Sequence, residues 1–305
     1  MNEGLTIAIP TYNREKQLLI QLNSILKQDL TGLNKILIID NNSNYDLSEK
    51  IHNLNHPKIH LVKNRVNIGM AVNMSSAFNY VNKGWLWILS DDDELVEGSV
   101  AKIVEKTNNS NHLCWIKYSI NEHNKYHDIQ IGSLEGLVDY FDNTPNMTKG
   151  DMVFISNNLF NMSFCAEYVE YAFAHSYSYI GFMLPALKLL DNNQAPMEFS
   201  SDLAVSYKKP VGRQYSFKKV GLGLSTISYI EWNLKKQKRR LLYKMLMSIT
   251  PGSYISWCKQ YGEDDDILTL ETLYNNIYKY TLPFSKKIKL VSYIIFLKVS
   301  KNLFA

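Results

Sequence analysis

The sequence predicts an α/β fold with a mostly parallel central sheet flanked by helices, followed by a helical and basic C-terminal region. In the first third of the chain, short apolar runs alternate with amphipathic helical patterns. Each of the first four apolar runs ends in a polar cluster. Residues 1–207 hold 15 Lys and Arg against 23 Asp and Glu, whereas residues 208–305 hold 18 against 6. We therefore expect two domains, over residues 1–207 and 208–305.

Four strands and three helices are expected in the first third. Apolar runs predict strands, and apolar residues spaced three or four apart predict helices. The expected strands are Leu5–Ile9, Lys35–Ile39, Lys58–Val62 and Trp85–Leu89, and the helices carry Leu18 to Leu26, Ala71 to Val81 and Val100 to Val104. Strands joined by helices form parallel sheets that are covered on both faces.

The composition excludes several classes of protein. The N-terminal residues show no basic stretch followed by an apolar one, so no signal peptide is expected. No window reaches the roughly 18–20 apolar residues that a spanning helix needs. Cys114, Cys165 and Cys258 are widely spaced and form no CxxC pair, which favours a reducing compartment and argues against structural zinc. We expect a cytoplasmic protein.

Polar clusters follow all four predicted strands. They read PTYNR, DNNS, NRVNIG and SDDDE in chain order. In open α/β sheets, ligands bind beyond the carboxyl ends of the strands. We therefore expect the four clusters to converge on one crevice.

Asp91, Asp92 and Asp93 form the most acidic of these clusters. Closely spaced carboxylates are hard oxygen ligands that suit Mg²⁺ or Mn²⁺, ions that bind together with a substrate's phosphates. The alternative is structural, since acidic residues also favour the positive end of the following helix.

Four motifs together resemble a known family. In this order and spacing, TIAIPTYNR, LIIDNNS, NIGMAVN and SDDDEL resemble the nucleotide-sugar-binding half of family 2 glycosyltransferases, which have the GT-A fold. The resemblance covers residues 4–105 well and weakens towards residue 207. It implies transfer of one sugar, with inversion, from a nucleotide-diphosphate donor to a hydroxyl of a growing glycan. A UDP-sugar is the first choice of donor and a dTDP-sugar the second, for a hexosyl or N-acetylhexosaminyl transferase.

The resemblance also implies the residues of the donor site. The loop that surrounds the base and ribose is matched by Pro10, Thr11, Tyr12 and Arg14. The pair that contacts the base is matched by Asp40 and Asn41. The segment that opens the next helix near the nucleotide is matched by Asn67, Gly69 and Asn73. The second member of the pair is Asn41 instead of an acid, and its amide oxygen can still accept from a pyrimidine N3–H. Val72 stands where the family often has arginine.

Asp91 and Asp93 match the outer members of the family's DXD motif. The resemblance implies that Asp91 lies towards the ribose and donor sugar and Asp93 towards a Mn²⁺ or Mg²⁺ ion, with Asp91 as a second metal ligand. Asp92 would share in donor binding. The metal would neutralise the diphosphate leaving group.

The catalytic base does not follow from a motif. Inverting members use an Asp or Glu, often in an ED pair, roughly 80–100 residues beyond the DXD motif, to deprotonate the acceptor hydroxyl. No ED pair occurs between Met152 and Asp202. The candidates are Glu167, Glu170, His175 and Asp191, with His175 and Glu170 ranked first. The alternatives are a solvated surface for the glutamates and a structural role for the histidine. The stretch ISNNLFN, residues 155–161, is expected near the acceptor.

The basic C-terminal region has two interpretations. Leu234 to Ile249 and Phe284 to Phe304 mix cations with apolar residues at helical spacing. Such stretches can lie on an anionic membrane surface, here the inner face of the cell membrane. Alternatively, they form a helical subdomain with solvated lysines. The glycines of GLGLST, residues 221–226, are expected to break the helical pattern. Nucleic acid is not expected as a partner, because aromatic and basic residues do not interleave.

The resemblance places the protein in synthesis of a bacterial capsule or O-antigen, with a glycan or a polyprenyl-linked oligosaccharide as the acceptor. Two other functions stay open. A nucleotidyltransferase would need a glycine-rich loop after the first strand, and PTYNREK has no glycine. A non-catalytic partner subunit that binds a nucleotide sugar or glycan is compatible with the missing ED pair.

Overall fold

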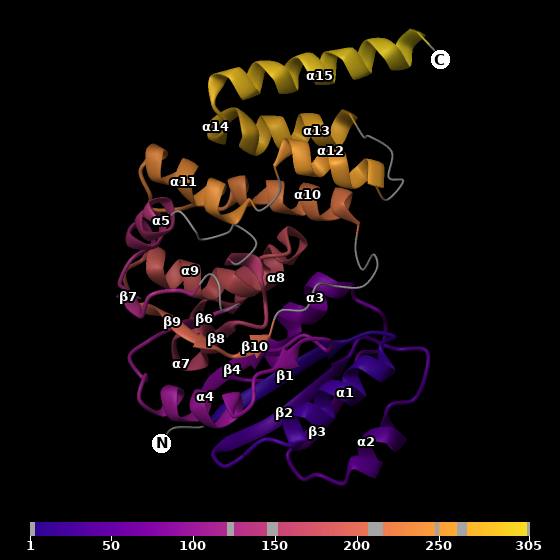
Figure 1. Ribbon diagram of the computed structural model, residues 1–305, viewed down its shortest axis with the longest axis vertical. Coiled ribbons are helices and arrows are strands. Elements are labelled where there is room, and N and C mark those ends of the chain that lie inside the picture. Colours follow the sequence, from indigo (N-terminus) through magenta and orange to yellow (C-terminus); the bar gives the residue numbers. More distant parts are fainter. Residues whose placement is uncertain are drawn as a thin grey trace. The chain divides into compact units, whose positions relative to one another are not determined.

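The chain folds into two units, one built on a sheet and one helical (Figure 1). The computed structural model describes residues 4–120, 125–144, 152–206, 216–247, 250–260 and 267–303. The sheet unit comprises Met1–Leu137, Phe154–Ser176 and Gly181–Lys209, and the helical unit comprises Val138–Val153, Tyr177–Ile180 and Pro210–Ala305. Two short segments from within residues 1–207 therefore belong to the helical unit.

An eight-stranded sheet forms the centre of the first unit. Its strands are β1 (Leu5–Thr11), β2 (Leu33–Asp40), β3 (Ile59–Lys63), β4 (Trp85–Ile88), β6 (Trp115–Ser119), β7 (Ile129–Ile131), β8 (Asn158–Asn161) and β9 (Met197–Leu203). They lie in the order β3-β2-β1-β4-β8-β6-β9-β7. Only β8 and β7 run against the others, so the predicted mostly parallel sheet is confirmed. A small second sheet pairs β5 (Glu94–Leu95) with β10 (Val205–Ser206).

Helices flank the sheet, as the alternating pattern predicts (Figure 1). They are α1 (Glu15–Leu26), α2 (Ser48–Leu54), α3 (Met70–Ser75), α4 (Ser99–Asn108), α7 (Met162–Cys165), α8 (Val169–Ala174) and α9 (Leu184–Asp191). Helix α5 (Leu134–Asn143) begins in the sheet unit, and its residues from Val138 on belong to the helical unit. The predicted helices did not include α2, a short helix whose Ile51 and Leu54 are only partly buried against the core. The helix expected from Ala71 to Val81 is α-helical only to Ser75, and a 3-10 turn (Ser76–Asn79) follows.

The main core lies between one face of the sheet and the helices α1 and α4. Alternate residues of β1, such as Ile7 and Ile9, pack there with Leu22 of α1, Trp87 of β4 and Ile103 of α4. Because side chains of a strand alternate between faces, every second residue of β1 contributes to this cluster. Full burial of such side chains stabilises the fold by about 1.5–3 kcal/mol each. This packing fixes the strand ends from which the polar clusters project.

The helical unit contains the C-terminal region. Its helices are α10 (Phe217–Ser225), α11 (Lys236–Leu246), α12 (Pro251–Gln260), α13 (Ile267–Leu273), α14 (Lys279–Thr281) and α15 (Phe284–Leu303), with a π-helical turn at Tyr274–Tyr278. None of the helices in the described part of the chain is both long and apolar enough to cross a bilayer.

The expected helix break at GLGLST is wrong. Helix α10 runs through both Gly221 and Gly223. A Cβ atom on Gly223 would lie 1.9 Å from the carbonyl oxygen of Tyr177. The glycine is therefore needed for a close approach of two backbones within the helical unit, and this outweighs its low helix propensity.

Candidate functional site

The polar clusters after β1, β2, β3 and β4 meet at one edge of the sheet. Backbone hydrogen bonds tie them together: the N–H of Asn41 donates to the carbonyl of Thr11 (2.9 Å), and that of Asn64 donates to the carbonyl of Asp40 (2.8 Å). The Thr11 hydroxyl reaches Asp91 beyond β4 (2.7 Å). The expected convergence of the four clusters is confirmed.

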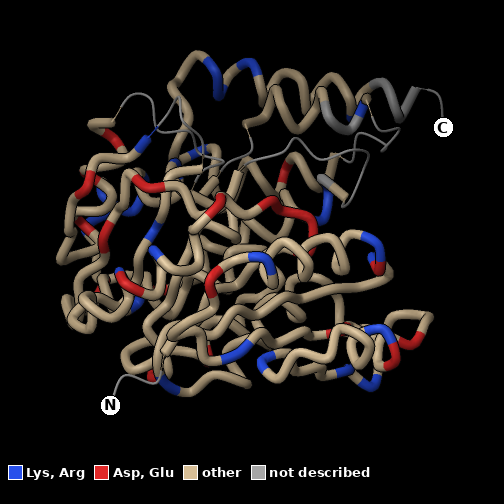
Figure 2. Tube along the Cα trace, turned by 60° about the horizontal axis from the view of Figure 1, so that its bottom comes forward, with Lys and Arg blue, Asp and Glu red and all other residues tan. Residues whose placement is uncertain are grey.

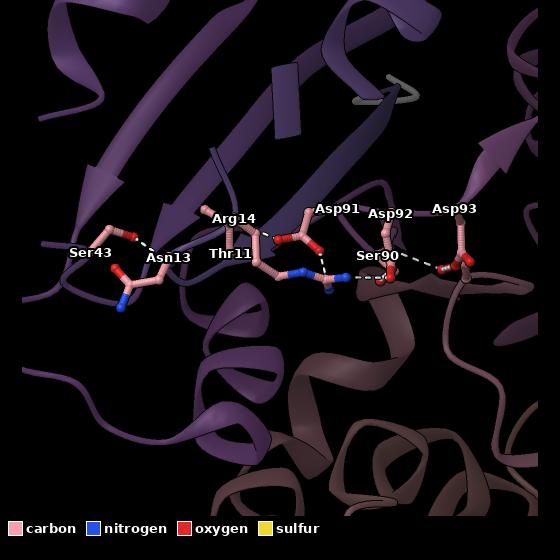
Figure 3. A network of polar contacts seen from close by, with 9 residues as sticks. Thr11, Asn13, Arg14, Ser43, Ser90, Asp91, Asp92 and Asp93 are labelled. Atoms are coloured by element: carbon pink, nitrogen blue, oxygen red, sulfur yellow. Dashed lines mark hydrogen bonds and ion pairs between the residues drawn. The ribbon is translucent and has the colours of Figure 1, made fainter. Parts of the chain in front are cut away.

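Tight turns after β1 and β2 orient these side chains. Asn13 and Asn42 have φ of 54° and 65°, a left-handed conformation that asparagine tolerates better than most residues. The turn places the N–H of Asn13 against the Ser43 hydroxyl (2.9 Å), and the N–H of Asn44 donates back to the side-chain oxygen of Asn13 (2.9 Å). These hydrogen bonds therefore hold the loop after β1 and the loop after β2 together (Figure 3).

Arg14 provides the positive charge within the aspartate cluster (Figure 3). Its Nη1 donates to Asp91 Oδ1 (2.7 Å) and its Nη2 to Asp92 Oδ2. The second oxygen of Asp91 accepts from Thr11. An arginine fork that joins two carboxylates offsets the repulsion that three adjacent aspartates would otherwise produce. The polypeptide itself thus supplies a counterion for its acidic cluster.

Asp93 has a different partner. Its Oδ2 accepts a hydrogen bond from the Ser156 hydroxyl, which lies just before β8. Ser156 is itself fixed, because its Oγ accepts from the Ser90 N–H (2.9 Å) and its carbonyl accepts from the Trp87 indole (2.7 Å). Strand β8 runs antiparallel to β4, so the start of β8 returns to the end of β4.

Burial raises the pKa values of the two outer aspartates. Asp91 and Asp93 are 3% and 8% exposed. Burial raises the pKa of Asp91 to about 6, although Arg14 and Thr11 favour its ionised form. Burial also raises the pKa of Asp93 to about 6, against the hydrogen bond from Ser156. Both carboxylates are therefore destabilised as anions at neutral pH and favour an approaching cation.

Four asparagines form a network behind the aspartates. The Asn41 side chain donates to Asn67 Oδ1 (2.8 Å), and its own oxygen accepts from Asn64 Nδ2 (3.1 Å) and from the N–H of Ile68 (2.9 Å). Asn64 also donates to Asn73 Oδ1 (2.8 Å). Asn41, Asn67 and Asn73 are thus brought together as expected, but their amides already bond one another. They hold the loop between β3 and α3 in place.

That loop ends at a glycine. Gly69 has φ of +85° directly before α3, a conformation that other residues adopt only with strain. Its N–H donates to Asn67 Oδ1 (2.9 Å). Gly69 thereby fixes where α3 begins relative to the strand ends.

Asp40 is fully buried at the end of β2. Its Oδ1 accepts from the N–H of Ser43 (2.9 Å), whereas its Oδ2 has no hydrogen-bond donor and lies 3.8 Å from Lys63 Nζ. A buried acceptor without a donor is unusual and requires an explanation. In the neighbouring loop after β1, Tyr12 is 42% exposed, whereas Pro10 lies within β1 opposite Ile39.

The candidate bases lie on or near α8 and α9. Glu167 and Glu170 are exposed, and Glu170 makes no hydrogen bond or ion pair with a described residue. His175 ends α8, where its half-buried ring stacks on Tyr171 at 6.2 Å between ring centroids. Burial lowers the pKa of His175.

Asp191 has a different setting from the other candidates. It is buried at the end of α9 and paired with Lys188 at 2.8 Å. This buried ion pair gives Asp191 a structural role.

Asp93 fits the requirement for a metal ligand better than Asp91 does. In the part of the chain that the structure describes, no group of three or more His, Cys, Asp or Glu side chains is placed to hold a metal ion. A divalent cation bound mainly by a substrate's phosphates needs only one or two carboxylates. No described group donates to Asp93 Oδ1, whereas Thr11 and Arg14 occupy both oxygens of Asp91.

The structure adds residues that the sequence did not single out. Ser43, Asn64 and Ser90 lie within the predicted clusters DNNS, NRVNIG and SDDDE, where no role was given to them, and Lys63 directly precedes the third cluster at the end of β3. Ser156 lies in the stretch that we expected near the acceptor, but its contact is with Asp93. Only the sheet order, which inserts β8 beside β4, predicts that contact.

Comparison with known proteins agrees with this geometry. The model of the family "Glycosyl transferase family 2" matches residues 6–173, more than half of the chain. The chain belongs to this family. The matched range contains β1 to β4, the three aspartates and β8.

Individual relatives of this family 2 chain match over shorter stretches. Abequosyltransferase RfbV of Salmonella typhimurium is 33% identical over 102 residues, which cover 32% of this chain and 30% of the relative. A Campylobacter jejuni protein named GalNAc(5)-diNAcBac-PP-undecaprenol beta-1,3-glucosyltransferase is 27% identical over 107 residues, 34% of each chain. The chain therefore spans about a third of the length of the curated relatives that it matches.

Solved structures share the fold over most of the chain. Residues 1–349 of S. aureus TarS, in complex with UDP-GlcNAc, match with a TM-score of 0.63 and 16% identity over 91% of this chain and 82% of that one. Mannosyltransferase PcManGT from Pyrobaculum calidifontis, in complex with GDP-Man and Mn²⁺, matches with a TM-score of 0.53 and 14% identity over 98% and 86%. At these identities the likeness concerns the fold, and it confirms the predicted GT-A architecture.

Proposed function

We propose that this chain is an inverting glycosyltransferase that moves a sugar from a nucleotide-diphosphate donor to a hydroxyl of a glycan. The observation that carries the proposal is the buried cluster of Asp91, Asp92 and Asp93 with Arg14 at the carboxyl ends of the strands. This edge is where ligands bind in α/β sheets. Membership of family 2 supports the reaction class.

The donor would lie over the ends of β1, β2 and β4. The Oδ2 of Asp40, which has no hydrogen-bond donor, could accept an N–H from the base, and the exposed ring of Tyr12 could stack on the base. A UDP-sugar is the first choice and a dTDP-sugar the second, because both bases carry an N3–H. The TarS structure that shares this fold contains UDP-GlcNAc, which supports the choice of UDP.

We propose that Asp93 would hold Mn²⁺ or Mg²⁺, with Asp91 nearby. Such an ion supplies positive charge to the diphosphate as the sugar leaves. Arg14 would give the same region a second, permanent positive charge, since guanidinium stays protonated. Thr11 and Ser156 would keep the two carboxylates in place through their hydrogen bonds. The PcManGT complex with Mn²⁺ supports a metal in this fold.

His175 is the proposed base for the acceptor hydroxyl, and Glu170 is the second candidate. A general base must be unprotonated at the working pH, and the lowered pKa of His175 favours its neutral form. The proton would pass from the acceptor oxygen to the ring nitrogen as that oxygen bonds to the anomeric carbon of the sugar, while the bond from this carbon to the diphosphate breaks and the nucleoside diphosphate leaves. Glu170 is accessible to an incoming acceptor because it is exposed.

The acceptor is proposed to be a glycan or a polyprenyl-linked oligosaccharide of a bacterial capsule or O-antigen. The names of the curated relatives support this class, since one of them contains an undecaprenol diphosphate acceptor. Contact with the inner face of the cell membrane is part of the proposal. Phe284, Ile288, Ile295 and Val299 are more than half exposed and lie on one face of α15. The charged residues of α15 are all lysines, and Figure 2 shows no acidic colour on this helix.

Thermal unfolding tests the donor site. UDP, dTDP, GDP and CMP, each with and without Mn²⁺, are added to the wild type, to Asp93→Asn and to the exposed control Glu49→Gln. At about 100 times its Kd, a ligand should raise the free energy of unfolding by about 2.7 kcal/mol. We expect UDP with Mn²⁺ to stabilise the wild type and the control, and Asp93→Asn to lose the effect. No shift with any nucleotide would contradict the donor site.

Hydrolysis of UDP-sugars then separates an enzyme from a binding subunit. A transferase transfers some sugar to water, and a protein that only binds its donor does not. We expect His175→Ala to slow turnover by about 10²–10⁴-fold while leaving the UDP-induced shift unchanged. Full activity of His175→Ala would show that His175 is not the base. Glu170 would then be the assigned base, and the variant Glu170→Gln tests it in the same way.

A further inference from the structure

The helical unit contains two neighbouring cavities of different chemistry. The larger has a volume of about 1000 Å³ and lies among α11, α12, α14 and α15. The smaller has a volume of about 550 Å³ and lies among α11, α14, the turn Thr226–Tyr229 and the turn Tyr274–Tyr278. Both are lined by Arg240 and Tyr280, so the two cavities adjoin.

The larger cavity is mainly apolar. Its apolar lining includes Leu241, Met247, Ile255, Leu282 and Leu290. Burying such surface on a ligand contributes about 25 cal/mol per Å², so an apolar chain is the ligand type that this lining favours. Its volume is at the upper end of the range of about 300–1000 Å³ that small-molecule pockets occupy.

The smaller cavity is polar and positively charged. Its cations are Lys236, Arg239, Arg240 and Lys279, and no Asp or Glu is part of either lining as the structure describes it. None of these four cations forms an ion pair with a described residue. Like charges gathered around one cavity repel, and an anion bound between them removes that cost.

Other cations of the same helix are already paired. Lys238 forms an ion pair with Asp139, and Lys244 forms one with Asp142 at 2.7 Å. One set of cations on α11 is thus neutralised by residues 138–143 of the same unit. The four cations around the smaller cavity have no acidic partner among the described residues, and Lys236, Arg239 and Arg240 are exposed, so an incoming anion can reach them.

We propose that the helical unit binds one molecule of a phosphorylated lipid, with its chain in the larger cavity and its phosphate in the smaller one. Arg240, which lines both cavities, would bond the phosphate where the chain begins. Guanidinium groups suit phosphate because they donate two parallel hydrogen bonds. The further assignment of this lipid as the carrier of the glycan acceptor rests on the proposed function, whereas the lipid site does not.

Farnesyl diphosphate is a soluble probe of this chemistry, and its two halves can be tested apart. Calorimetric titration of the full chain compares farnesyl diphosphate, farnesol and pyrophosphate. We expect saturable binding of farnesyl diphosphate, at least about tenfold tighter than that of either half. Binding of pyrophosphate as tight as that of farnesyl diphosphate would overturn the role of the larger cavity.

Two variants test where the ligand binds. Arg239→Gln/Lys279→Gln should weaken farnesyl diphosphate about tenfold or more, whereas Lys219→Gln/Lys287→Gln, which makes the same charge change outside both linings, should not. Gly252 lies in the lining of the larger cavity, and a Cβ atom there would meet no atom within 4 Å. Gly252→Leu should therefore fill the cavity, preserve helix α12, and weaken farnesyl diphosphate without weakening pyrophosphate.

Vesicles and nucleotides complete the test. If phosphatidylglycerol vesicles bind the chain but farnesyl diphosphate does not, a membrane-facing surface replaces the lipid cavity and the inference is overturned. Equal affinity of the wild type and Arg239→Gln/Lys279→Gln for farnesyl diphosphate would overturn it as well. Binding of UDP is measured on the same samples, so loss of the donor site and loss of the lipid site are separate results.

Discussion

Both units of this chain gather charges of one sign, but they balance them differently. In the sheet unit, Arg14 bonds Asp91 and Asp92, so the acidic cluster contains its own counterion. In the helical unit, Arg239 and Lys279 line a cavity whose described residues include no acid. The first region is assembled before any ligand arrives. The second has no acid among its described lining residues to balance its charge, and so its occupancy should depend more on the ligand and on salt.

This difference determines how the removal of one cation changes the free energy of unfolding in each unit. Removing one partner of a buried ion pair leaves the other partner uncompensated, which is strongly destabilising. Removing one of several cations that have no acidic partner among the described residues relieves repulsion instead. The same type of substitution, an arginine made neutral, should therefore have opposite consequences in the two units.

Arg14→Met should produce the largest loss of stability. Full loss of one partner of a buried pair costs about 3–5 kcal/mol, and because the Arg14 side chain is 28% exposed we expect about 2–3 kcal/mol less free energy of unfolding at pH 7.5. Urea unfolding of the ligand-free chain measures the loss. In the double variant Arg14→Met/Asp91→Asn, most of the stability should return, because the buried carboxylate that loses its counterion is then neutral and the Asp92 side chain is 26% exposed. A loss below about 0.5 kcal/mol in Arg14→Met would show that Asp91 does not need this counterion.

Much of the sheet unit could be predicted from sequence. Apolar runs such as Leu5–Ile9 and Trp85–Leu89 are buried strands flanked by helices, and such strands have a recognisable composition. Because parallel strands end at the same edge of a sheet, the strand pattern alone predicts that Thr11, Asp40 and Asp91 lie together. The four-motif resemblance led to the family whose model matches the chain.

The remaining parts depend on contacts between residues far apart in the chain. Ser156 follows Asp93 by 63 residues, and only the insertion of antiparallel β8 next to β4 brings the two together. Gly223 gives a break signal locally, yet the backbone of Tyr177 decides that α10 continues through it. Asn41 looked available to a base, but Asn64 and the N–H of Ile68 occupy its oxygen. In each case a tertiary contact overrode a local signal.

The pH dependence of stability measures the cost of ionising a buried carboxylate of the acidic cluster. Burial raises the pKa of Asp93 in the folded chain to about 6, from its ordinary value of 3.8. Protonated Asp93 therefore stabilises the fold relative to its anion. This contribution is fully present below about pH 4 and is lost as the pH rises through 6. Without metal or nucleotide, Asp93→Asn should therefore be more stable than the wild type by about 3 kcal/mol at pH 7.5. The difference should shrink towards zero at pH 4.

Ser156→Ala provides the matched control for this titration. Its hydrogen bond favours the ionised form of Asp93, so its loss should destabilise the chain more at pH 7.5 than at pH 5. Both variants are followed by urea unfolding at each pH in the presence of a chelator. A constant difference between Asp93→Asn and the wild type from pH 4 to 7.5 would mean that Asp93 is not strained as a buried anion.

The smallest effect is expected for Arg239→Gln/Lys279→Gln, the helical counterpart of Arg14→Met. Neither cation has an acidic partner among the described residues, so no charge is left uncompensated when both are removed. We expect the free energy of unfolding to stay within about 0.5 kcal/mol of the wild type, with any change stabilising at low salt and vanishing at high salt. Lys238→Gln, which breaks the ion pair with Asp139, should instead be slightly destabilising at low salt. If Arg239→Gln/Lys279→Gln lost more than about 1 kcal/mol, these cations would be structural, and the contrast between the two units would fail.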